Sequence, residues 1–351
     1  MSNDWLKLTD RGLYCEPGGF YVDPWRPVDR AVVTHAHSDH ASHGCRHYLG
    51  SVESRELFRL RLPADAEFQF LADGEPLSVG GVNISLHPAG HILGSVMVRL
   101  EYRGQVVVIT GDYKLGDDRT CRSWQPQRCH LLVTESTFGL PVYRWEDQEI
   151  TFASINDWWR RSAEEGKCCL LYGYAVGKSQ RLLSGLDPAI GPIYTHGAVE
   201  KATEAYRASG VDLPATSPVA SLPKTTSFAG AMVVAVPGAH GTPWMRRFGD
   251  VTSAMASGWM AIRGTRRRKA VDRGFVLSDH ADWPGLMSAV KACEPEEVWV
   301  THGYTEVMSR HLQSLGYRAK TLATRYSSEG EASDESAIDE VGGDVATGED
   351  T

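Results

Sequence analysis

The sequence predicts a layered α/β protein, and two features of the chain carry this prediction. Short runs rich in β-branched residues, bounded by Gly or Pro, follow one another in the first half. Further along, similar runs alternate with segments whose apolar residues recur at helical spacing. Strands in succession, then strands alternating with helices, favour sheets layered with helices. With 351 residues, 42% of them apolar, the chain has room for one large or two ordinary domains.

The expected strands are short apolar runs with β-branched or aromatic residues. In chain order they are GGFYV (18–22), AVVTH (31–35), VNISLHP (82–88), SVMVRLEY (95–102), QVVVITGD (105–112), HLLVTES (130–136), KCCLLYGY (167–174), AMVVAVPG (231–238), GFVLSDH (274–280) and EVWVTHG (297–303). Apolar residues at helical spacing predict helices over 55–62, 150–166 and 177–186.

Polar side chains capable of metal binding or acid–base chemistry stand at the ends of these strands. A rigid sheet can hold such groups, and the loops that carry them, at one edge. We therefore expect them to converge. These strand-end residues are His35, Asp112, Glu135, His280 and His302.

The stretch THAHSDHA (34–41) places His35, His37, Asp39 and His40 within six positions. Neither a regular helix nor a regular strand aims all four side chains at one point, so we expect a turn. Imidazoles suit zinc, iron or manganese, and a carboxylate among them suits a hydrolytic divalent cation. Together with the other strand-end groups, these four side chains are more ligands than one tetrahedral zinc ion binds. Two metal ions that share a bridging carboxylate would use all of them. No catalytic role is expected for His43, His47, His87 and His130.

In THAHSDHA and the surrounding motifs YVDP, PAGHILGS and ITGD, the chain resembles the metallo-β-lactamase superfamily. The later motifs ESTFG, SDHADW and VTHG resemble its β-CASP nuclease branch, which includes Artemis-type DNA nucleases, RNase J and the polyadenylation-site nuclease. The phrases FYVDPWRPVDRAVVTHAHSDHA and VLSDHADWPGL resemble bacterial ligase-associated DNA exonucleases. The resemblance covers about residues 10–325. It implies a metallo-β-lactamase αββα sandwich with an inserted β-CASP α/β domain.

The resemblance also implies the metal ligands. One metal ion would be held by His35, His37 and His91, the second by Asp39, His40 and His302, and both would be bridged by Asp112.

Three further residues have implied roles around the metals. Asp23 would hydrogen-bond a ligand or the ligand loop, fixing imidazole orientation. Glu135 would orient His280, which would contact the scissile phosphate or protonate the leaving oxygen. The predicted catalytic residues are therefore Asp39, Asp112, Glu135 and His280.

The third β-CASP motif bears on the choice between DNA and RNA. Eukaryotic DNA-processing relatives usually carry valine there, whereas His302 in VTHG resembles the RNA-processing members. The ligase-associated DNA enzymes also carry THG. The phrases that resemble those enzymes lead us to expect DNA.

The resemblance implies a discontinuous first domain. We expect metallo-β-lactamase parts over 1–147 and 266–326, a β-CASP insert over 148–265 and an acidic tail over 327–351.

Residues 237–274 form the most basic part of the chain. Its guanidinium groups could pair with phosphates and its tryptophans could stack on unpaired bases, although a solvated charged face would have the same composition. Its place just before His280 favours nucleic-acid contact. The turn before the helix expected at 177–186 could seat a phosphate or be a simple tight turn. The candidate nucleic-acid contacts are Lys178, Trp244, Arg246, Trp259, Arg266, Arg267 and Arg268.

The net charge of −8 comes from the tail, because residues 327–351 hold nine acidic side chains and no Lys or Arg. The other residues together carry about +1. With few large apolar side chains, the tail is expected to be disordered and solubilising, or alternatively to mimic nucleic acid.

Seven cysteines without CxxC spacing suggest reduced thiols in a cytoplasmic protein. The chain has no signal-peptide pattern and no apolar run long enough to predict a membrane span.

We therefore expect a cytoplasmic DNA exonuclease of DNA repair that uses two divalent metal ions, zinc or manganese. Its partners would be DNA and, by resemblance, a DNA ligase and a helicase of the same system. The first alternative is an RNase J-like ribonuclease. A small-molecule hydrolase would not need the long insert, Glu135 or His280, and the intact ligand set argues against a non-catalytic binding protein.

Overall fold

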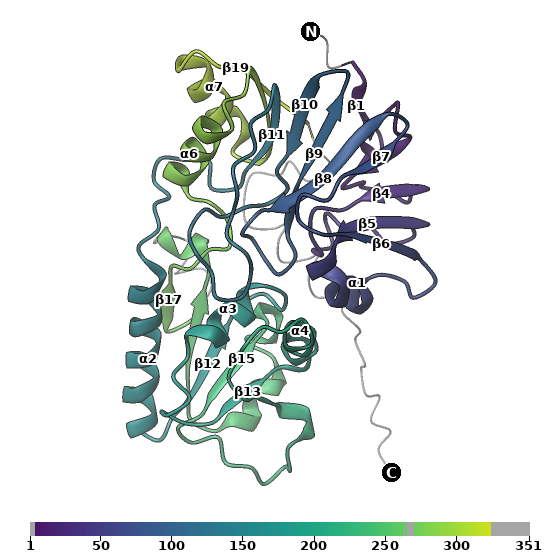
Figure 1. Cartoon of the computed structure of the whole chain (residues 1–351). Helices are drawn as coiled ribbons and strands as arrows, with labels where there is room; N and C mark the ends of the chain where they lie inside the picture. The colour runs from purple at the N-terminus through teal and green to yellow at the C-terminus, as the bar shows by residue number, and fades with distance from the viewer. Residues whose placement is uncertain (1–3, 263, 265–269, 324–351) are drawn as a thin grey trace.

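The computed structural model describes residues 4–262, 264 and 270–323. Within these residues the chain forms a mixed α/β fold with three sheets and six α-helices (Figure 1). The tail over 327–351 and the cationic residues Arg266, Arg267 and Arg268 lie outside the described part.

The first sheet is built from the six N-terminal strands in chain order. β1, β2 and β3 pair antiparallel, and β3 to β6 pair in parallel. The strands are β1 (Leu6–Thr9), β2 (Gly12–Cys15), β3 (Phe20–Val22), β4 (Arg30–Val32), β5 (His47–Ser51) and β6 (Glu67–Leu71).

The second sheet has seven strands in the order β19-β18-β11-β10-β9-β8-β7. β7 to β10 form an antiparallel meander, whereas β11, β18 and β19 continue parallel to β10. The strands are β7 (Leu77–Val79), β8 (Val82–Pro88), β9 (Val96–Tyr102), β10 (Gln105–Ile109), β11 (Leu131–Ser136), β18 (Glu297–Gly303) and β19 (Arg318–Thr321).

The third sheet is parallel throughout, in the order β14-β13-β15-β12-β16-β17. All its strands fall in sequence between β11 and β18 of the second sheet. They are β12 (Cys168–Tyr172), β13 (Ile193–Thr195), β14 (Ser217–Pro218), β15 (Met232–Ala235), β16 (Val251–Ala256) and β17 (Arg273–Phe275).

The helices pack against these sheets and, for α1 and α4, against each other. The α-helices are α1 (Arg55–Arg61), α2 (Gln148–Glu164), α3 (Lys178–Gly185), α4 (Gly197–Ala208), α6 (Trp283–Cys293) and α7 (Thr305–Ser314). Short 3-10 segments are η1 (Val52–Ser54), η2 (Val219–Ser221), η3 (Pro237–Ala239), η4 (Pro243–Phe248) and η5 (Gly258–Ala261).

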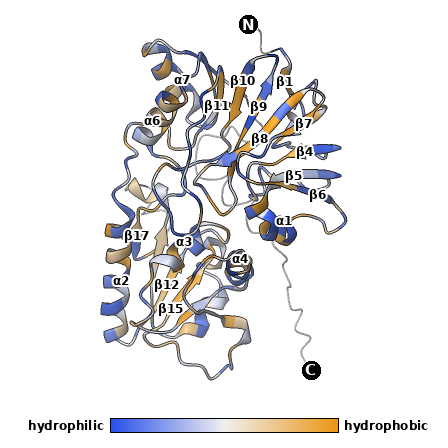
Figure 2. Cartoon of the chain, in the orientation of Figure 1, coloured by the Kyte–Doolittle hydropathy of each residue, from blue (hydrophilic) through white to orange (hydrophobic). Residues whose placement is uncertain are grey.

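Three apolar clusters hold the layers together. One fills the space between the first and second sheets, with Phe20 and Val22 facing Ile84 and Val98. A second packs α6 and α7 on the opposite face of the second sheet. The third surrounds the parallel sheet and extends to α1, which contacts α4. Figure 2 shows the apolar central strands β10, β12 and β15 mostly in orange, as expected for strands that are largely buried on both faces.

The α2 helix shows why these segments are helical. Asp147 caps its N-terminus by accepting a hydrogen bond from the Glu149 amide. The side chains of Phe152, Ile155 and Trp159 recur at helical spacing and are buried.

The strands and helices predicted from the sequence are present, with one notable difference. GFVLSDH was expected to be a strand up to His280, but β17 ends at Phe275. The carbonyl groups of the next residues accept hydrogen bonds from side chains instead of a neighbouring strand. β17 also pairs with β16 of the third sheet, beyond the insert boundary expected at residue 265.

The seven cysteines are all free, and Cys168 and Cys169 are buried in β12. No helix in the described ranges is both long and apolar enough to cross a membrane.

Candidate metal centre

The predicted ligands lie in loops and strand ends of the first two sheets. The THAHSDHA loop follows β4, and Asp112 lies three residues after the end of β10. His91 lies in the connection between β8 and β9, and His302 lies near the end of β18. The sheets therefore bring together side chains that are far apart in the sequence.

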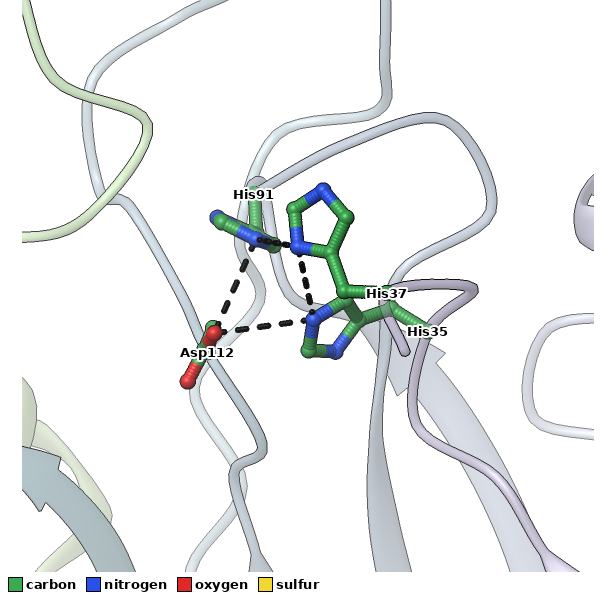
Figure 3. A group of neighbouring side chains, drawn as sticks. All are labelled: His35, His37, His91 and Asp112. Atoms are coloured by element: carbon green, nitrogen blue, oxygen red, sulfur yellow. Dashed lines mark hydrogen bonds and ion pairs between the residues drawn. The ribbon is translucent and has the colours of Figure 1, made fainter. Parts of the chain in front are cut away.

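His35, His37, His91 and Asp112 form the first group, and their ligand atoms all lie within 4.8 Å of one another (Figure 3). His37 Nδ1 lies 3.1 Å from both His35 Nε2 and His91 Nε2. Asp112 Oδ2 lies 3.5 Å from His35 Nε2 and 3.7 Å from His91 Nε2. Three imidazole nitrogens and one carboxylate oxygen thus face a common point, as a divalent metal requires.

The second group contains Asp39 and His40 and shares His35 with the first group. His40 Nε2 is 3.5 Å from Asp39 Oδ2 and 3.5 Å from Asp112 Oδ2. Ligand atoms of His35, Asp39 and His40 also lie within 4.8 Å of one another. His302 joins this group through its ring, which stacks on His40 with centroids 5.4 Å apart. The same Asp112 oxygen is therefore shared between two sets of imidazoles.

Asp23 contacts the THAHSDHA loop through its carboxylate. Its carboxylate accepts hydrogen bonds from the Thr34 amide at 2.8 Å and the Thr34 hydroxyl at 2.6 Å. Asp23 Oδ2 also lies 2.7 Å from His40 Nδ1. Because Nδ1–H donates to this carboxylate, the Nε2 lone pair of His40 is the one directed at the centre.

Backbone carbonyl groups orient two further imidazoles. His91 Nδ1 lies 2.9 Å from the Asp279 carbonyl oxygen, and His37 Nε2 lies 3.2 Å from the Val176 carbonyl oxygen. Each ring donates outward, and its other nitrogen faces the first group. Partners of this kind fix the tautomer that a metal ligand needs.

The residues present fit a pair of divalent cations. His40 Nε2 is a buried nitrogen without a hydrogen-bond partner in the described part of the chain, and it points between Asp39 and Asp112. A buried polar atom with no partner is costly unless an ion or water satisfies it. Mixed imidazole and carboxylate donors suit zinc, manganese or iron.

The protonation states follow from burial and neighbouring charges. Burial and the adjacent imidazoles hold the pKa of His35 and His91 well below the ordinary value, and burial also lowers the pKa of His37. Burial opposes ionisation of Asp112, but nearby His40 outweighs it, so the pKa of this carboxyl is lowered. Three rings are thus neutral and the bridging position anionic, the states needed for metal binding.

Glu135 and His280 contact each other beside the candidate metal ligands. His280 Nδ1 lies 3.0 Å from both carboxylate oxygens of Glu135, which is buried. The Tyr113 amide donates to the same carboxylate at 2.8 Å. The His280 ring lies 4.6 Å from that of His91, measured between centroids. A histidine held this way by a carboxylate can act as an acid at the adjacent centre.

A pocket lies beside this arrangement. It is lined by His37, Asp39, His91, Asp112 and His280, and also by Tyr174 after β12, Lys178 at the start of α3 and Trp259 in η5 after β16, at the carboxyl edge of the third sheet. Ligand sites typically lie at this edge of parallel sheets.

The predicted nucleic-acid contacts occupy different surroundings. Trp259 lines the pocket and packs on Phe138 with ring centroids 4.7 Å apart. Trp244 lies away from the pocket-lining residues, half-buried against Phe248 and the third-sheet core. Arg246 is exposed in η4. The structure thus places one of these three side chains in the pocket.

Lys178 is buried rather than exposed to incoming phosphates, with 3% of its surface accessible. Its ammonium lies 2.9 Å from Asp279 Oδ2 and donates to the Leu277 carbonyl at 3.0 Å. Sequence reasoning missed Asp279 and its second partner, Arg181. Their signals were the acidic residue next to His280 and two cationic residues three positions apart on α3.

Comparison with known sequences identifies relatives among nucleases and one described as a ligase, although no protein-family model matches the chain. The chain is 31% identical over 318 residues to a probable DNA ligase of Opitutus terrae, a match covering 90% of this chain and 31% of that protein. It is 34% identical over 116 residues to cleavage and polyadenylation specificity factor 73 of Drosophila melanogaster, covering 32% and 16% respectively. It is 24% identical over 229 residues to an RNase J-like protein of Methanocaldococcus jannaschii, covering 57% and 54%.

These matches leave much of each relative unaligned, and the chain spans about a third of the length of the Opitutus protein. Among solved structures, a protein of unknown function from Enterococcus faecalis V583 has a TM-score of 0.58 at 12% identity, covering 85% of this chain and 80% of that one. That likeness concerns the fold alone. On its similarity to these sequence relatives, the chain belongs to the metallo-β-lactamase/β-CASP nuclease family.

Proposed function

We propose that the protein is a metal-dependent exonuclease that hydrolyses phosphodiester bonds of DNA in DNA repair. The observation that carries this proposal is the shared carboxylate of Asp112, whose Oδ2 lies 3.5 Å from both His35 Nε2 and His40 Nε2. A carboxylate between two imidazole sets is what a bridged pair of divalent cations needs. The relative described as a probable DNA ligase, which aligns with 90% of this chain, favours DNA as the substrate.

The proposed ligands divide around Asp112. One zinc or manganese ion would be held by His35, His37 and His91, and the other by Asp39, His40 and His302. When bound, such ions lower the pKa of water and neutralise charge on the phosphoryl oxygens.

The chain's own acid is His280. Its ring lies beside His91, and the Glu135 carboxylate accepts its Nδ1–H and stabilises the charged imidazolium. The other ring nitrogen donates a proton to the departing alkoxide, which is a poor leaving group until protonated. Because Glu135 is buried and also held by the Tyr113 amide, it keeps the ring in one orientation.

We further propose metallo-β-lactamase parts over 1–147 and 266–326, with a β-CASP insert over 148–265 and the tail over 327–351. The sequence position of the third sheet between β11 and β18 supports an insert. The pairing of β17 with β16 favours continuing it to Phe275.

Nucleic acid would approach along the pocket wall that carries Trp259. Arg246, which is exposed in η4, would contact backbone phosphates. The same role is proposed for Arg266, Arg267 and Arg268, which lie outside the described residues. A DNA ligase and a helicase of the same repair system, in the cytoplasm, are the proposed partners.

The proposal is tested with Asp112→Ala and His37→Ala on DNA labelled at its 5′ or 3′ end, with zinc or manganese added. Both variants should lose at least about a hundredfold in rate, because each removes a metal ligand. His43→Ala is the matched control, since His43 is an exposed histidine two residues beyond the ligand loop. Undiminished cleavage by either ligand variant rejects the metal assignment, and product ladders from the two labels give the polarity.

The second candidate function is an RNase J-like ribonuclease. His302 at the third β-CASP motif and the RNase J-like relative, aligned with 57% of this chain, favour it. Competition between DNA and RNA strands of the same sequence separates the two proposals. Preferential cleavage of RNA would overturn the choice of DNA.

A further inference from the structure

The segment 277–280 carries His280 and contacts the metal ligands through its backbone. The Asp279 carbonyl accepts the Nδ1–H of His91 at 2.9 Å, and the His280 amide donates to Ser278 Oγ at 3.1 Å. This segment follows β17 but belongs to no strand. Something other than sheet pairing must therefore fix its path.

Two cations on α3 supply that restraint. The ammonium of Lys178 donates to the Leu277 carbonyl at 3.0 Å and lies 2.9 Å from Asp279 Oδ2. The guanidinium of Arg181 donates to the Ser278 carbonyl and lies 3.2 Å from Asp279 Oδ1. With His91, these side chains occupy three consecutive carbonyl groups and both carboxylate oxygens of Asp279.

Arg181 is itself anchored on its other side. Its Nε lies 3.1 Å from Asp118 Oδ2, and its Nη2 donates to Gln148 Oε1 at 2.9 Å. Lys114 Nζ lies 3.3 Å from the same Asp118 oxygen. Arg181 is 5% exposed, so these contacts form away from water, where electrostatic interactions are stronger.

We infer that Lys178 and Arg181 are positioning residues that hold segment 277–280, and with it His91 and His280, at the metal centre. They lie one helical turn apart on one face of α3 and so reach adjacent carbonyl groups together. The kinetic part of this inference rests on the proposed nuclease function; the metal-binding part does not.

The alternative role for Lys178 is direct phosphate binding, because its side chain also lines the pocket. Its ammonium already contacts a carboxylate and a carbonyl oxygen, and the Arg181 nitrogens face protein acceptors. A phosphate ligand raises KM when removed, whereas a positioning residue lowers kcat through misplaced catalytic groups.

The test compares Lys178→Met and Arg181→Met with Arg119→Met in the full chain. Arg119 is the matched control, because it also contacts α3 and α2, donating to the Ser184 carbonyl at 3.1 Å and pairing with Glu149 at 2.8 Å, but is half-exposed. Folding is checked by circular dichroism. The readouts are the absorption spectrum of bound cobalt, metal affinity against a chelator, and separate kcat and KM values on DNA.

Both buried-site variants should change the cobalt spectrum and lower metal affinity or kcat by about 10- to 100-fold, the usual cost of losing an outer-shell partner. KM for DNA should stay within about twofold, and Arg119→Met should match the parent chain. A raised KM with unchanged kcat and spectrum, or no change at all, overturns the inference.

If Arg181→Met fails to fold, Arg181→Lys keeps the charge and must still alter the spectrum. If the parent chain cleaves no nucleic acid, the proposed function fails, and the spectrum and metal affinity still decide the positioning role.

Discussion

At the scale of single residues, the candidate centre depends on backbone conformations that side chains rarely adopt. Asp23 and His302 have φ values of 44° and 52°, in the left-handed region. Such a conformation costs a non-glycine residue about 1–3 kcal/mol. In return, Asp23 reaches Thr34 and His40 together, and His302 turns from β18 to stack on His40. At these two positions the strain coincides with contacts that hold the candidate ligands.

The resemblance carried by the motifs predicted which side chains lie together. In the structure, His35, His37, His91 and Asp112 form one cluster, and Glu135 contacts His280. Their roles in catalysis remain proposals.

The burial of Lys178 could not be predicted from the sequence. A lysine in the first turn of a helix is as compatible with binding a phosphate as with a buried ion pair. Only the fold shows that Asp279, a hundred residues away, is its partner. Pairing between distant residues is a property of the packed chain that neither residue type nor spacing encodes.

Metal binding should release a proton from His40. Burial opposes protonation of this ring, but Asp112, Asp39 and Asp23 outweigh burial and raise its pKa well above the ordinary value. A metal takes the Nε2 lone pair, so the proton must leave on binding. Below the raised pKa, metal affinity should therefore increase with pH by about tenfold per unit for each proton released.

Calorimetry of zinc binding in two buffers with different ionisation heats counts these protons. His40→Ala should release about one proton fewer at neutral pH. An equal count for the variant and the parent chain would contradict the assignment of the charged ring.

At the scale of elements, the central strands were the easiest to predict. β10, β11, β12 and β15 are buried on both faces, so their sequences are continuous apolar runs. β6 was not predicted because its apolar residues alternate with exposed Glu67 and Gln69 on an edge strand. β17 is shorter than predicted, since the chain after Phe275 contacts side chains of α3 instead of a strand.

The turn between β18 and α7 should tolerate no side chain at Gly303. This glycine has φ 76°, and a Cβ there would lie 2.4 Å from the Ser136 carbonyl oxygen and 2.5 Å from Thr137 Cα. Gly316 has φ 93° but open space around its would-be Cβ. Gly316→Ala therefore measures backbone strain alone, whereas Gly303→Ala adds a clash with β11.

We expect Gly316→Ala to lower the free energy of unfolding by about 1–2 kcal/mol. Gly303→Ala should cost about 3 kcal/mol or more, because backbone atoms must move. It should also weaken metal binding, since His302 is the preceding residue. Urea unfolding measures the first effect and chelator competition the second. Equal losses of stability for the two variants would show that the predicted clash is relieved at no cost.

At the scale of the whole molecule, the site is assembled from all three sheets. The first supplies the THAHSDHA loop after β4, the second supplies Asp112, Glu135 and His302, and η5 with Trp259 follows β16 of the third. The resemblance implied a discontinuous first domain, and that division stays a prediction. Neither the resemblance nor the motifs indicated that α3 contacts the segment carrying His280, because the contact joins residues about a hundred positions apart.

The uneven charge of the chain gives the last prediction. Removing residues 327–351 changes the net charge from −8 to about +1. Proteins with net charge near zero repel one another weakly, so solubility at neutral pH should fall. If the tail only solubilises, KM for DNA at physiological salt should stay within about twofold, because charges more than a Debye length from the site, about 8 Å, are screened.

The matched control is a full-length chain whose nine acidic tail residues are changed to Asn or Gln, which keeps length and removes charge. A several-fold lower KM for both variants at physiological salt, with inhibition by the separate tail peptide, would instead show that the tail competes with DNA for the basic segment 237–274.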